Sequence, residues 1–397
     1  MHLTPRNELE TRLAKVQARI RQANLDGMFV FHKTDVFYLT GTAQNGVVFV
    51  PPEGDPVFPV RRSVHRARSE SAWTEIVPFR SPRELPNLLA ARGHAGLRRL
   101  GVDLDVLPAR LYLQLGTVFP NAELVDTSLV LREVRMVKSP YEIERIEQAA
   151  EQLRTVMAGI PAMIRDGCTR EIELAARIEG ALRLRRHQGI IRCRRYGLEM
   201  LYGAVSTGAS ASYPTDFDGP DGMEGLYPAV PQNGGERLFR HGEPIMIDLC
   251  GGYDGYIADK TRIFCPGGLR DEELIRAHHY ALQIQEAVQA RLRPGAHTGR
   301  LWQAVEEMVA DSPFAGNFMG YGDNQSRFVG HGVGLELDEL PILTGRSEVV
   351  LKQGMVIAVE PKFFFGDRGG VGIENTWVVT QDGCRNLTAD SDAIVAV

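Results

Sequence analysis

The sequence predicts a small α/β domain followed by a larger α+β domain with a mainly antiparallel sheet. Within the first third of the chain, short apolar runs alternate with helical stretches. A strong helix-start signal follows at Lys138, and beyond Leu201 glycine- and proline-rich loops separate strand-like runs. Helices followed by runs of strands are typical of an α+β domain. We therefore expect one domain over residues 1–132 and a second over residues 133–397.

The N-terminal domain is expected to open with an amphipathic helix, because apolar residues recur at helical spacing on a polar background. These residues are Leu9, Leu13, Val16 and Ile20. Three apolar runs then predict buried strands. They are GMFVF (27–31), NGVVFV (45–50) and LRRLGVDL (98–105).

The second domain is expected to begin with the helical segment KSPYEIERIEQAAEQL (138–153). Ser139 can cap this helix, Pro140 suits its first turn, and Glu142 stands where the partner of a capping box belongs. Later segments predict a further helix and two strands, TREIELAARIEGALRLRR (169–186), PIMIDL (244–249) and TWVVT (376–380).

Composition and charge argue against several classes of protein. The formal net charge of -5 gives no support for binding nucleic acid or an anionic membrane. The polar N-terminal segment lacks the apolar core of a secretion signal, and no apolar stretch is long enough to span a bilayer. The cysteines are scattered without a C-x-x-C pair, which is typical of a reducing compartment, so we expect a cytoplasmic protein. They are Cys168, Cys193, Cys250, Cys265 and Cys384.

Five polar residues in the second domain lie in apolar, strand-like runs, where an isolated charge is unfavourable unless it is paired or binds metal. They are Asp248, Asp259, His331, Glu360 and Glu374. Each alone has an ordinary explanation, such as a strand end, an ion pair or a hydrogen-bonded core histidine. Together, four carboxylates and one imidazole are a suitable ligand set for two divalent metal ions. Oxygen-rich coordination with one imidazole favours Mn, Fe, Co or Zn.

With these segments the chain resembles the pita-bread metallopeptidases, the family of prolidase, aminopeptidase P, methionine aminopeptidase and creatinase. The resemblance lies in FYLTG (37–41), KSPYEIERI, IDLCGGYDGYIADKTRIF, FVGHGVGLELDELP, VIAVEP and GVGIENTWVV. It implies a creatinase-type N-terminal domain followed by a pita-bread catalytic domain. It further implies that Asp259 and Glu374 bridge two metal ions and that Glu360 helps to activate a bridging water.

The ligand histidine lies in a glycine-rich segment. Gly330, Gly332 and Gly334 surround His331. We expect these glycines to let the backbone pass close to metal and substrate and to adopt positive φ angles.

Three positions depart from the pattern of the family's peptidases. Asp338 stands seven residues after His331, where those enzymes have a second histidine, and Thr215 stands in the place of another histidine. Gly372 replaces an arginine. The two histidines would donate hydrogen bonds to substrate and oxyanion, and losing one such donor costs roughly a hundred- to a thousandfold in rate. We expect Asp338 to act as a base or a cation partner, with a turn-capping aspartate as the alternative.

Further substrate-binding candidates come from loops in both domains. Tyr213, Asp216 or Asp218 could fill the place assigned to Thr215. Arg61 and Arg62 could bind substrate, because in creatinase-like relatives the N-terminal domain of one subunit reaches the active site of the other. The same resemblance implies a homodimer. The alternative for both arginines is a solvated basic turn.

The resemblance implies an Xaa-Pro dipeptidase or aminopeptidase that cleaves a peptide bond with a metal-bridged hydroxide. The alternative within the same fold is a C–N hydrolase or lyase that acts on a small cationic or zwitterionic metabolite, with Asp338 as base or cation partner. A third hypothesis is a non-catalytic binding protein on the same scaffold. The five ligand residues favour an enzyme that acts on a small molecule or short peptide.

Overall fold

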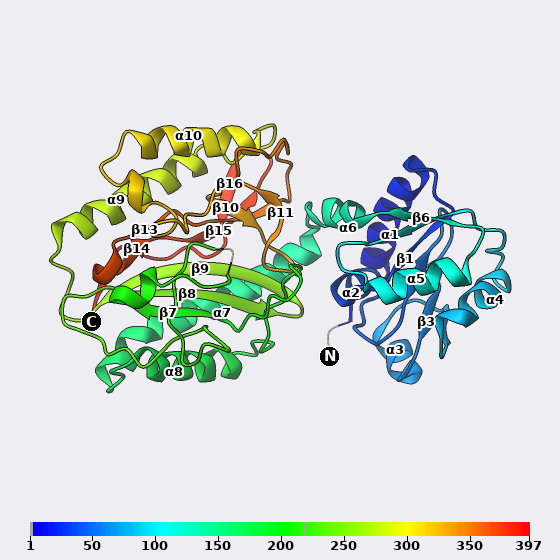
Figure 1. Cartoon of the computed structure of the whole chain (residues 1–397), viewed down its shortest axis with the longest axis horizontal. Coiled ribbons are helices and arrows are strands. Elements are labelled where there is room, and N and C mark those ends of the chain that lie inside the picture. The colour runs from blue at the N-terminus through cyan, green and yellow to red at the C-terminus, as the bar shows by residue number, and fades with distance from the viewer. Residues whose placement is uncertain (1–2, 218) are drawn as a thin grey trace. The chain divides into compact units, whose positions relative to one another are not determined.

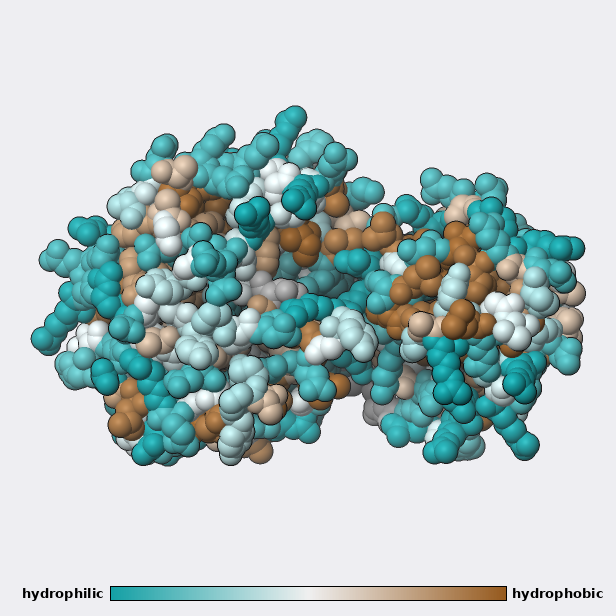
Figure 2. All heavy atoms as spheres, in the orientation of Figure 1, coloured by the Kyte–Doolittle hydropathy of each residue, from teal (hydrophilic) through white to brown (hydrophobic). Residues whose placement is uncertain are grey.

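The computed structural model describes residues 3–217 and 219–397, which form two compact units, Met1–Arg135 and Met136–Val397. The first unit runs from blue to cyan in Figure 1 and the second from green to red. No helix in the described part of the chain is long and apolar enough to cross a membrane. The face drawn in Figure 2 is mostly hydrophilic, with a group of hydrophobic side chains on the N-terminal unit and smaller groups elsewhere.

The N-terminal unit contains a four-stranded sheet of order β2-β1-β5-β6 and a separate parallel pair, β3-β4. Strands β1, β5 and β6 are parallel, and β2 is antiparallel to β1. Its elements are α1 (Arg6–Gln22), β1 (Gly27–Val30), α2 (Lys33–Thr40), β2 (Val48–Val50), β3 (Phe58–Val60), α3 (Val64–Glu70), β4 (Ile76–Pro78), the 3₁₀ helix η1 (Pro82–Glu84), α4 (Leu85–Ala90), β5 (Arg99–Val102), α5 (Ala109–Val118), β6 (Glu123–Asp126) and α6 (Ser128–Arg135).

The expected opening helix is present as α1, and the four apolar residues that predicted it are all buried. The three expected strands are β1, β2 and β5. All three are shorter than their apolar runs, β1 by one residue and the other two by more. The first half of the 45–50 run is irregular, and β5 ends at Val102, before a turn that begins with Asp103.

The C-terminal unit begins with the expected long helix. Ser139 and Glu142 form the predicted capping box, with the Glu142 amide donating to Ser139 Oγ and the Ser139 amide donating to Glu142 Oε2. The elements of this unit are α7 (Pro140–Arg165), α8 (Glu171–Leu184), β7 (Gly203–Thr207), η2 (Gly208–Ser212), β8 (Ile245–Tyr253), β9 (Tyr256–Cys265), α9 (Glu272–Gln289), α10 (Thr298–Ala310), η3 (Ala315–Asn317), β10 (Gly330–Gly332), β11 (Glu339–Ile342), β12 (Val356–Val359), β13 (Lys362–Phe364), η4 (Gly366–Arg368), β14 (Gly370–Gly372), β15 (Asn375–Val379), β16 (Cys384–Asn386) and β17 (Val395–Ala396).

The strands of this unit form two main sheets, of order β17-β9-β8-β7 and β11-β10-β12-β15-β16, and a short pair, β13-β14. Pairing is antiparallel except between β17 and β9, so the prediction of a mainly antiparallel sheet is confirmed. Helices α7 and α8 lie on one side of these strands, and α9 and α10 lie on the other (Figure 1). Of the predicted ligand residues, Asp248, Asp259 and His331 lie on these strands, and Glu360 and Glu374 lie next to strand ends.

Candidate metal centre

Two of the predicted ligands lie on one face of the β8-β9 hairpin. In this antiparallel pair Asp248 is opposite Thr261, and Cys250 is opposite Asp259. Residues two apart on a strand share a face, as do residues opposite each other. The eleven-residue spacing of the aspartates, with a turn between them, therefore brings both carboxylates to the same side of the sheet.

The other three ligands come together across the second sheet. His331 is opposite Ala358, which lies two residues before Glu360, so His331 and Glu360 share a face. Ala358 is in turn opposite Thr376 and Val359 is opposite Asn375, so one further pair in this register brings Glu374 opposite Glu360. All five predicted ligand side chains are buried. Sequence positions far apart thus converge on one interior site.

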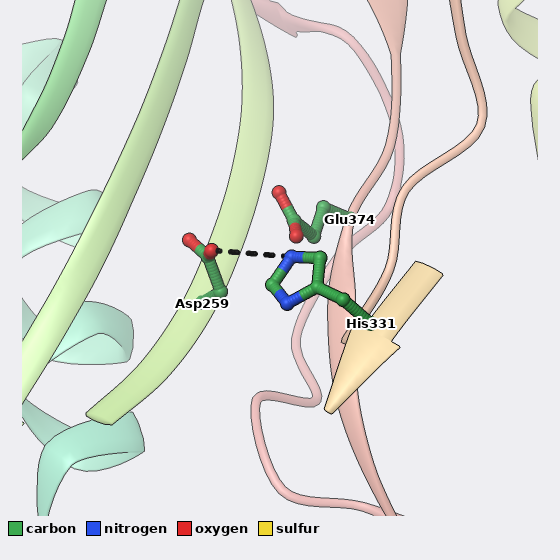
Figure 3. A group of neighbouring side chains, drawn as sticks. All are labelled: Asp259, His331 and Glu374. Atoms are coloured by element: carbon green, nitrogen blue, oxygen red, sulfur yellow. Dashed lines mark ion pairs between the residues drawn. The ribbon is translucent and has the colours of Figure 1, made fainter. Parts of the chain in front are cut away.

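The hydrogen bonds of His331 fix which ring nitrogen can bind a metal. Its Nδ1 lies 3.1 Å from two carbonyl oxygens, those of Gly332 and Leu337. Because a carbonyl oxygen can only accept, Nδ1 must carry the proton and Nε2 presents its lone pair. Nε2 points toward Asp259, whose Oδ2 is 3.9 Å away (Figure 3). It also lies 3.6 Å from Glu360 Oε1. A ring N–H that donates to a backbone carbonyl while the other nitrogen is left for the metal is typical of metal-binding histidines.

Asp259, His331 and Glu374 are arranged as a metal site. One ligand atom from each lies within 4.8 Å of the others, and the three side chains point toward a common centre (Figure 3). Thr261 Oγ1 donates to Glu374 Oε2 (2.9 Å), whereas Glu374 Oε1 has no hydrogen-bond partner among the described residues. A buried carboxylate oxygen without a partner is costly, and a cation would satisfy it. These residues therefore fit a divalent ion.

A second group of carboxylates, Asp221, Asp248 and Glu360, also has ligand atoms within 4.8 Å of one another. This group surrounds the ammonium of Lys362, a fully buried residue at the start of β13. Lys362 Nζ lies 2.6 Å from Asp248 Oδ2, 2.9 Å from Glu360 Oε2 and 3.0 Å from Asp221 Oδ2. Because the Lys362 ammonium lies among these three carboxylates, the group does not fit the second of the two expected metal ions.

The pKa values of the carboxyl groups in the site are shifted in opposite directions by burial and by neighbouring charges. Burial raises the pKa of Glu374 to about 8, and burial together with the charge of Glu374 raises that of Asp259 well above its ordinary value. Burial would also raise the pKa of Asp248, but the charge of Lys362 and the hydrogen bonds from Asp221, Lys362 and Thr261 together outweigh burial and lower it. Burial and the neighbouring charge of Asp248 raise the pKa of Asp221. The pKa values of these two neighbouring aspartates are therefore shifted in opposite directions.

Asp338 lies on the wall of the cavity that contains the metal ligands. Its side chain is 30% exposed, and Oδ1 is 3.6 Å from His331 Nδ1. The loop before it is held in place by Glu339, which accepts two backbone N–H groups, from Leu335 and Glu336, and pairs with the buried Lys138 at 3.0 Å. Asp338 thus faces the site and remains accessible to a substrate.

The loop residues that could bind substrate differ in where they lie relative to this cavity. Thr215 lines a neighbouring cavity of about 280 Å³ that shares Asp221 with the metal site, and its hydroxyl accepts the Phe217 amide. Tyr213 is 57% exposed. Asp216 is exposed and pairs with Arg195 at 2.5 Å, and Asp218 lies outside the described residues.

The two arginine candidates lie in the N-terminal unit. Arg61 and Arg62 are both exposed in the turn between β3 and α3, where the Arg61 amide donates to the Asn45 carbonyl. Exposed side chains in this turn fit the solvated basic turn as well as a contact with a second subunit. A substrate-binding role for them remains a prediction.

The glycines around His331 allow close packing of neighbouring strands and do not adopt the expected positive φ angles. The positive-φ glycines in the described part of the chain lie elsewhere. A Cβ on Gly330 would lie 2.3 Å from the Ala358 carbonyl oxygen, and one on Gly332 would lie 2.3 Å from that of Leu340. The expectation of positive φ angles is therefore wrong, and these glycines let neighbouring strands pack closely around the ligand histidine.

Sequence reasoning missed Asp221 and Lys362. Asp221 lies in a glycine- and proline-rich loop whose composition predicts only a turn, so no pattern singled it out. Lys362, in the run EPKFFF, did carry a signal, because a lysine in an apolar strand-like run needs a buried partner or a route to solvent. Its place two residues after Glu360 would have directed attention to the ligand cluster.

Comparisons with known proteins agree with this architecture. Residues 144–381 match Metallopeptidase family M24, and residues 12–137 match the Creatinase/Prolidase N-terminal domain. The chain is 27% identical to the uncharacterized peptidase YqhT of Bacillus subtilis over 95% of this chain and 97% of that protein. It is 26% identical to the Xaa-Pro dipeptidase of Pyrococcus furiosus over 96% of this chain and 98% of that protein.

A solved structure extends this likeness to the fold. The Xaa-Pro dipeptidase from Bacillus anthracis superposes with a TM-score of 0.81 at 23% identity, covering 98% of this chain and all of that one. The predicted order of a creatinase-type N-terminal domain followed by a pita-bread domain is confirmed.

Proposed function

The chain belongs to metallopeptidase family M24, and we propose that it is an Xaa-Pro dipeptidase or aminopeptidase acting on short peptides. The observation that carries this proposal is the convergence of Asp259, His331 and Glu374 on one buried point, with the partnerless oxygen of Glu374 beside it. The whole-length likeness to an Xaa-Pro dipeptidase supports the substrate class.

The metal would be held by Asp259, His331 and Glu374, with Glu360 Oε1 close to the histidine nitrogen. The mixed carboxylate and imidazole donors suit Mn, Fe, Co or Zn. When bound, such an ion lowers the pKa of a water molecule and polarises a carbonyl oxygen. The deep burial of these ligands excludes bulk water from the reacting bond, which strengthens every charge interaction there.

Glu360 is the residue placed to move a proton. Its Oε1 lies on the side of His331 and its Oε2 accepts a hydrogen bond from Lys362 at 2.9 Å, so the carboxylate is held in one orientation. A fixed carboxylate beside the metal ligands can take a proton from the attacking water and pass it to the leaving nitrogen. Nδ1 of His331 is engaged by carbonyl oxygens and cannot serve this purpose.

A second candidate function is supported by Asp338. An anionic side chain on the cavity wall attracts a positively charged group and disfavours a substrate carboxylate. Gly372 also cannot be replaced by an arginine in this backbone, because a Cβ there would lie 2.6 Å from Lys362 Cα. Both observations favour hydrolysis or elimination on a small cationic or zwitterionic metabolite.

One experiment separates the two functions. Protein loaded in turn with Mn²⁺, Fe²⁺, Co²⁺ and Zn²⁺ is assayed against Xaa-Pro dipeptides, longer Xaa-Pro peptides, and a panel of cationic amides and betaines. We expect turnover of the Xaa-Pro substrates that is lost in a His331→Ala variant. Turnover of the cationic substrates alone would establish the second function. Absence of metal binding and of all activity would instead favour a binding protein on the same scaffold.

The proposal also includes the oligomeric state of the protein and its location in the cell. We infer a homodimer from the likeness to creatinase-type proteins, with Arg61 and Arg62 as the residues of the N-terminal unit that would meet a partner's site. Sedimentation of the wild-type chain and of an Arg61→Ala, Arg62→Ala double variant, each with kinetics, tests both points. Among the described residues no two of the five cysteines form a disulfide, which is consistent with the predicted cytoplasmic location.

A further inference from the structure

We propose that the Lys362 ammonium replaces one of the two cations of the centre, so that each chain holds a single metal ion. This inference rests on the proposed metal-dependent function and concerns how that function is built. The ion would lie among Asp259, His331 and Glu374, while Lys362 neutralises the carboxylates on the other side.

The contacts of Lys362 leave no room for an ion in the second group of carboxylates. Metal–oxygen bonds to carboxylates are about 2.0–2.2 Å long. An ion bound to Asp221, Asp248 and Glu360 would have to lie at the point already taken by Lys362 Nζ, which is 2.6–3.0 Å from an oxygen of each. The ion and the ammonium are therefore alternative occupants of one position.

Two glutamates connect the ammonium to the predicted ion, as bridging carboxylates connect two metals. Glu360 places Oε2 at 2.9 Å from Lys362 Nζ and Oε1 at 3.6 Å from His331 Nε2. Glu374 places Oε2 at 3.3 Å from Nζ, and its Oε1 has no hydrogen-bond partner within the described part of the chain. Each carboxylate thus has one oxygen toward the lysine and one toward the metal ligands.

Lys362 cannot readily move away to admit a second ion. Its side chain is fully buried, and withdrawing a buried ammonium from its carboxylates is strongly unfavourable. Its backbone is also fixed, because β13 pairs with β14 and Lys362 lies directly opposite Gly372. The absence of a side chain on Gly372 allows this close approach, since a Cβ there would lie 2.6 Å from Lys362 Cα.

The same contacts define what Lys362 does. An ammonium has three N–H groups, and three carboxylate oxygens lie within 3.0 Å of Nζ. No donor remains for a substrate oxygen. Lys362 is therefore a positioning residue that holds Asp248 and Glu360 in place, and it does not act as an electrophile or a base.

The number of bound ions tests this inference directly. Wild-type protein is equilibrated with excess Mn²⁺, freed of unbound ions and examined by elemental analysis and electron paramagnetic resonance. We expect about one Mn²⁺ per chain with the spectrum of an isolated ion, and loss of that ion in His331→Ala. About two ions per chain with an exchange-coupled spectrum would overturn the inference while leaving the proposed function intact. Failure of the wild type to bind any Mn²⁺, together with absence of activity, would contradict both.

A pair of lysine variants adds a matched comparison. Lys362→Met removes the ammonium and is expected to raise the stoichiometry to about two, because the three carboxylates then need another cation. Lys260→Met is the control, since Lys260 is equally buried in the same unit but pairs with Asp390 at 2.6 Å. We expect it to retain about one ion. Should either variant fail to fold by circular dichroism, the wild-type stoichiometry and spectrum still decide the question.

Discussion

Lys362 Nζ lies 2.6 Å from Asp248 Oδ2, and both side chains are buried. A carboxylate that the sequence assigns to a metal ion is therefore paired with a lysine of the same chain. Asp248 and Lys362 come from strands in different sheets, β8 and β13, which the fold brings together at the centre. The site combines three carboxylates that hold the ammonium with a cluster of ligands that fits an ion.

Replacing Glu360 with glutamine should reduce turnover and leave metal binding intact. The amide keeps the shape of the side chain but cannot accept the proton of an attacking water. Loss of a general base typically lowers kcat by about 10²–10⁴, and steady-state kinetics at saturating metal would measure it. Glu306→Gln, which alters an exposed glutamate on α10, is the control. Unchanged kcat in Glu360→Gln would assign the proton transfer to another residue.

Asp338 should determine the charge preference of the substrate. Replacing it with histidine removes a negative charge from the cavity wall and adds a hydrogen-bond donor, which should raise kcat/KM for Xaa-Pro dipeptides by up to about a hundredfold. Cationic amides should become poorer substrates. Asp338→Asn, which removes the charge alone, separates the two effects. If both variants lose peptidase activity, Asp338 is required for the peptide reaction and does not oppose it.

Gly372→Ala should destabilise the protein, because the new Cβ would lie 2.6 Å from Lys362 Cα and from the Pro361 carbonyl oxygen. Overpacking of this kind costs roughly 1–3 kcal/mol of the free energy of unfolding. Urea denaturation compares it with Gly383→Ala, where the added methyl would meet nothing within 4 Å. Equal stability of the two variants would show that β13 and β14 can separate without cost.

His187 should make the C-terminal unit less stable in acid. Its Nδ1 accepts the Gly189 amide and its Nε2 lies 3.1 Å from the Cys250 carbonyl oxygen, so the folded state holds the neutral ring. Burial lowers its pKa below the unfolded value of about 6.5. The stability it contributes is present above pH 6.5 and is lost as the pH falls toward the folded pKa, because the unfolded state then binds the proton more tightly.

Urea unfolding at a series of pH values between neutral and about 5 measures this dependence. His187→Gln should weaken the dependence, whereas His279→Gln, at an exposed position in the same unit, should leave it unchanged. If the free energy of unfolding of His187→Gln fell with decreasing pH as steeply as that of the wild type, His187 would not be the cause of the pH dependence.

The sequence was most informative where an unfavourable side chain interrupted an apolar run. Asp248, Asp259 and Glu374 stood out because burying a carboxylate demands a partner. The structure buries all of them, with Asp259 and Glu374 in one ligand group and Asp248 in the other. The capping box at Ser139 was equally clear, because it depends only on residues three apart. Features that depend on neighbouring residues in this way can be predicted without knowing the rest of the fold.

Contacts set by the pairing of distant strands could not be predicted in this way. Lys362 meets Asp221 and Asp248 across more than a hundred residues of sequence, through two sheets whose register no local pattern reveals. The close approach at Gly372 likewise depends on strand pairing, so its replacement of an arginine had no explanation from sequence alone.

Anomalous diffraction from Mn²⁺-soaked crystals of the wild-type protein tests the central claim most directly. We predict one anomalous peak per chain, within bonding distance of Asp259, His331 and Glu374, with the Lys362 ammonium still against Asp248. A second peak among Asp221, Asp248 and Glu360, with Lys362 displaced, would contradict the single-ion centre. The absence of any peak at the histidine would contradict the metal-dependent function itself.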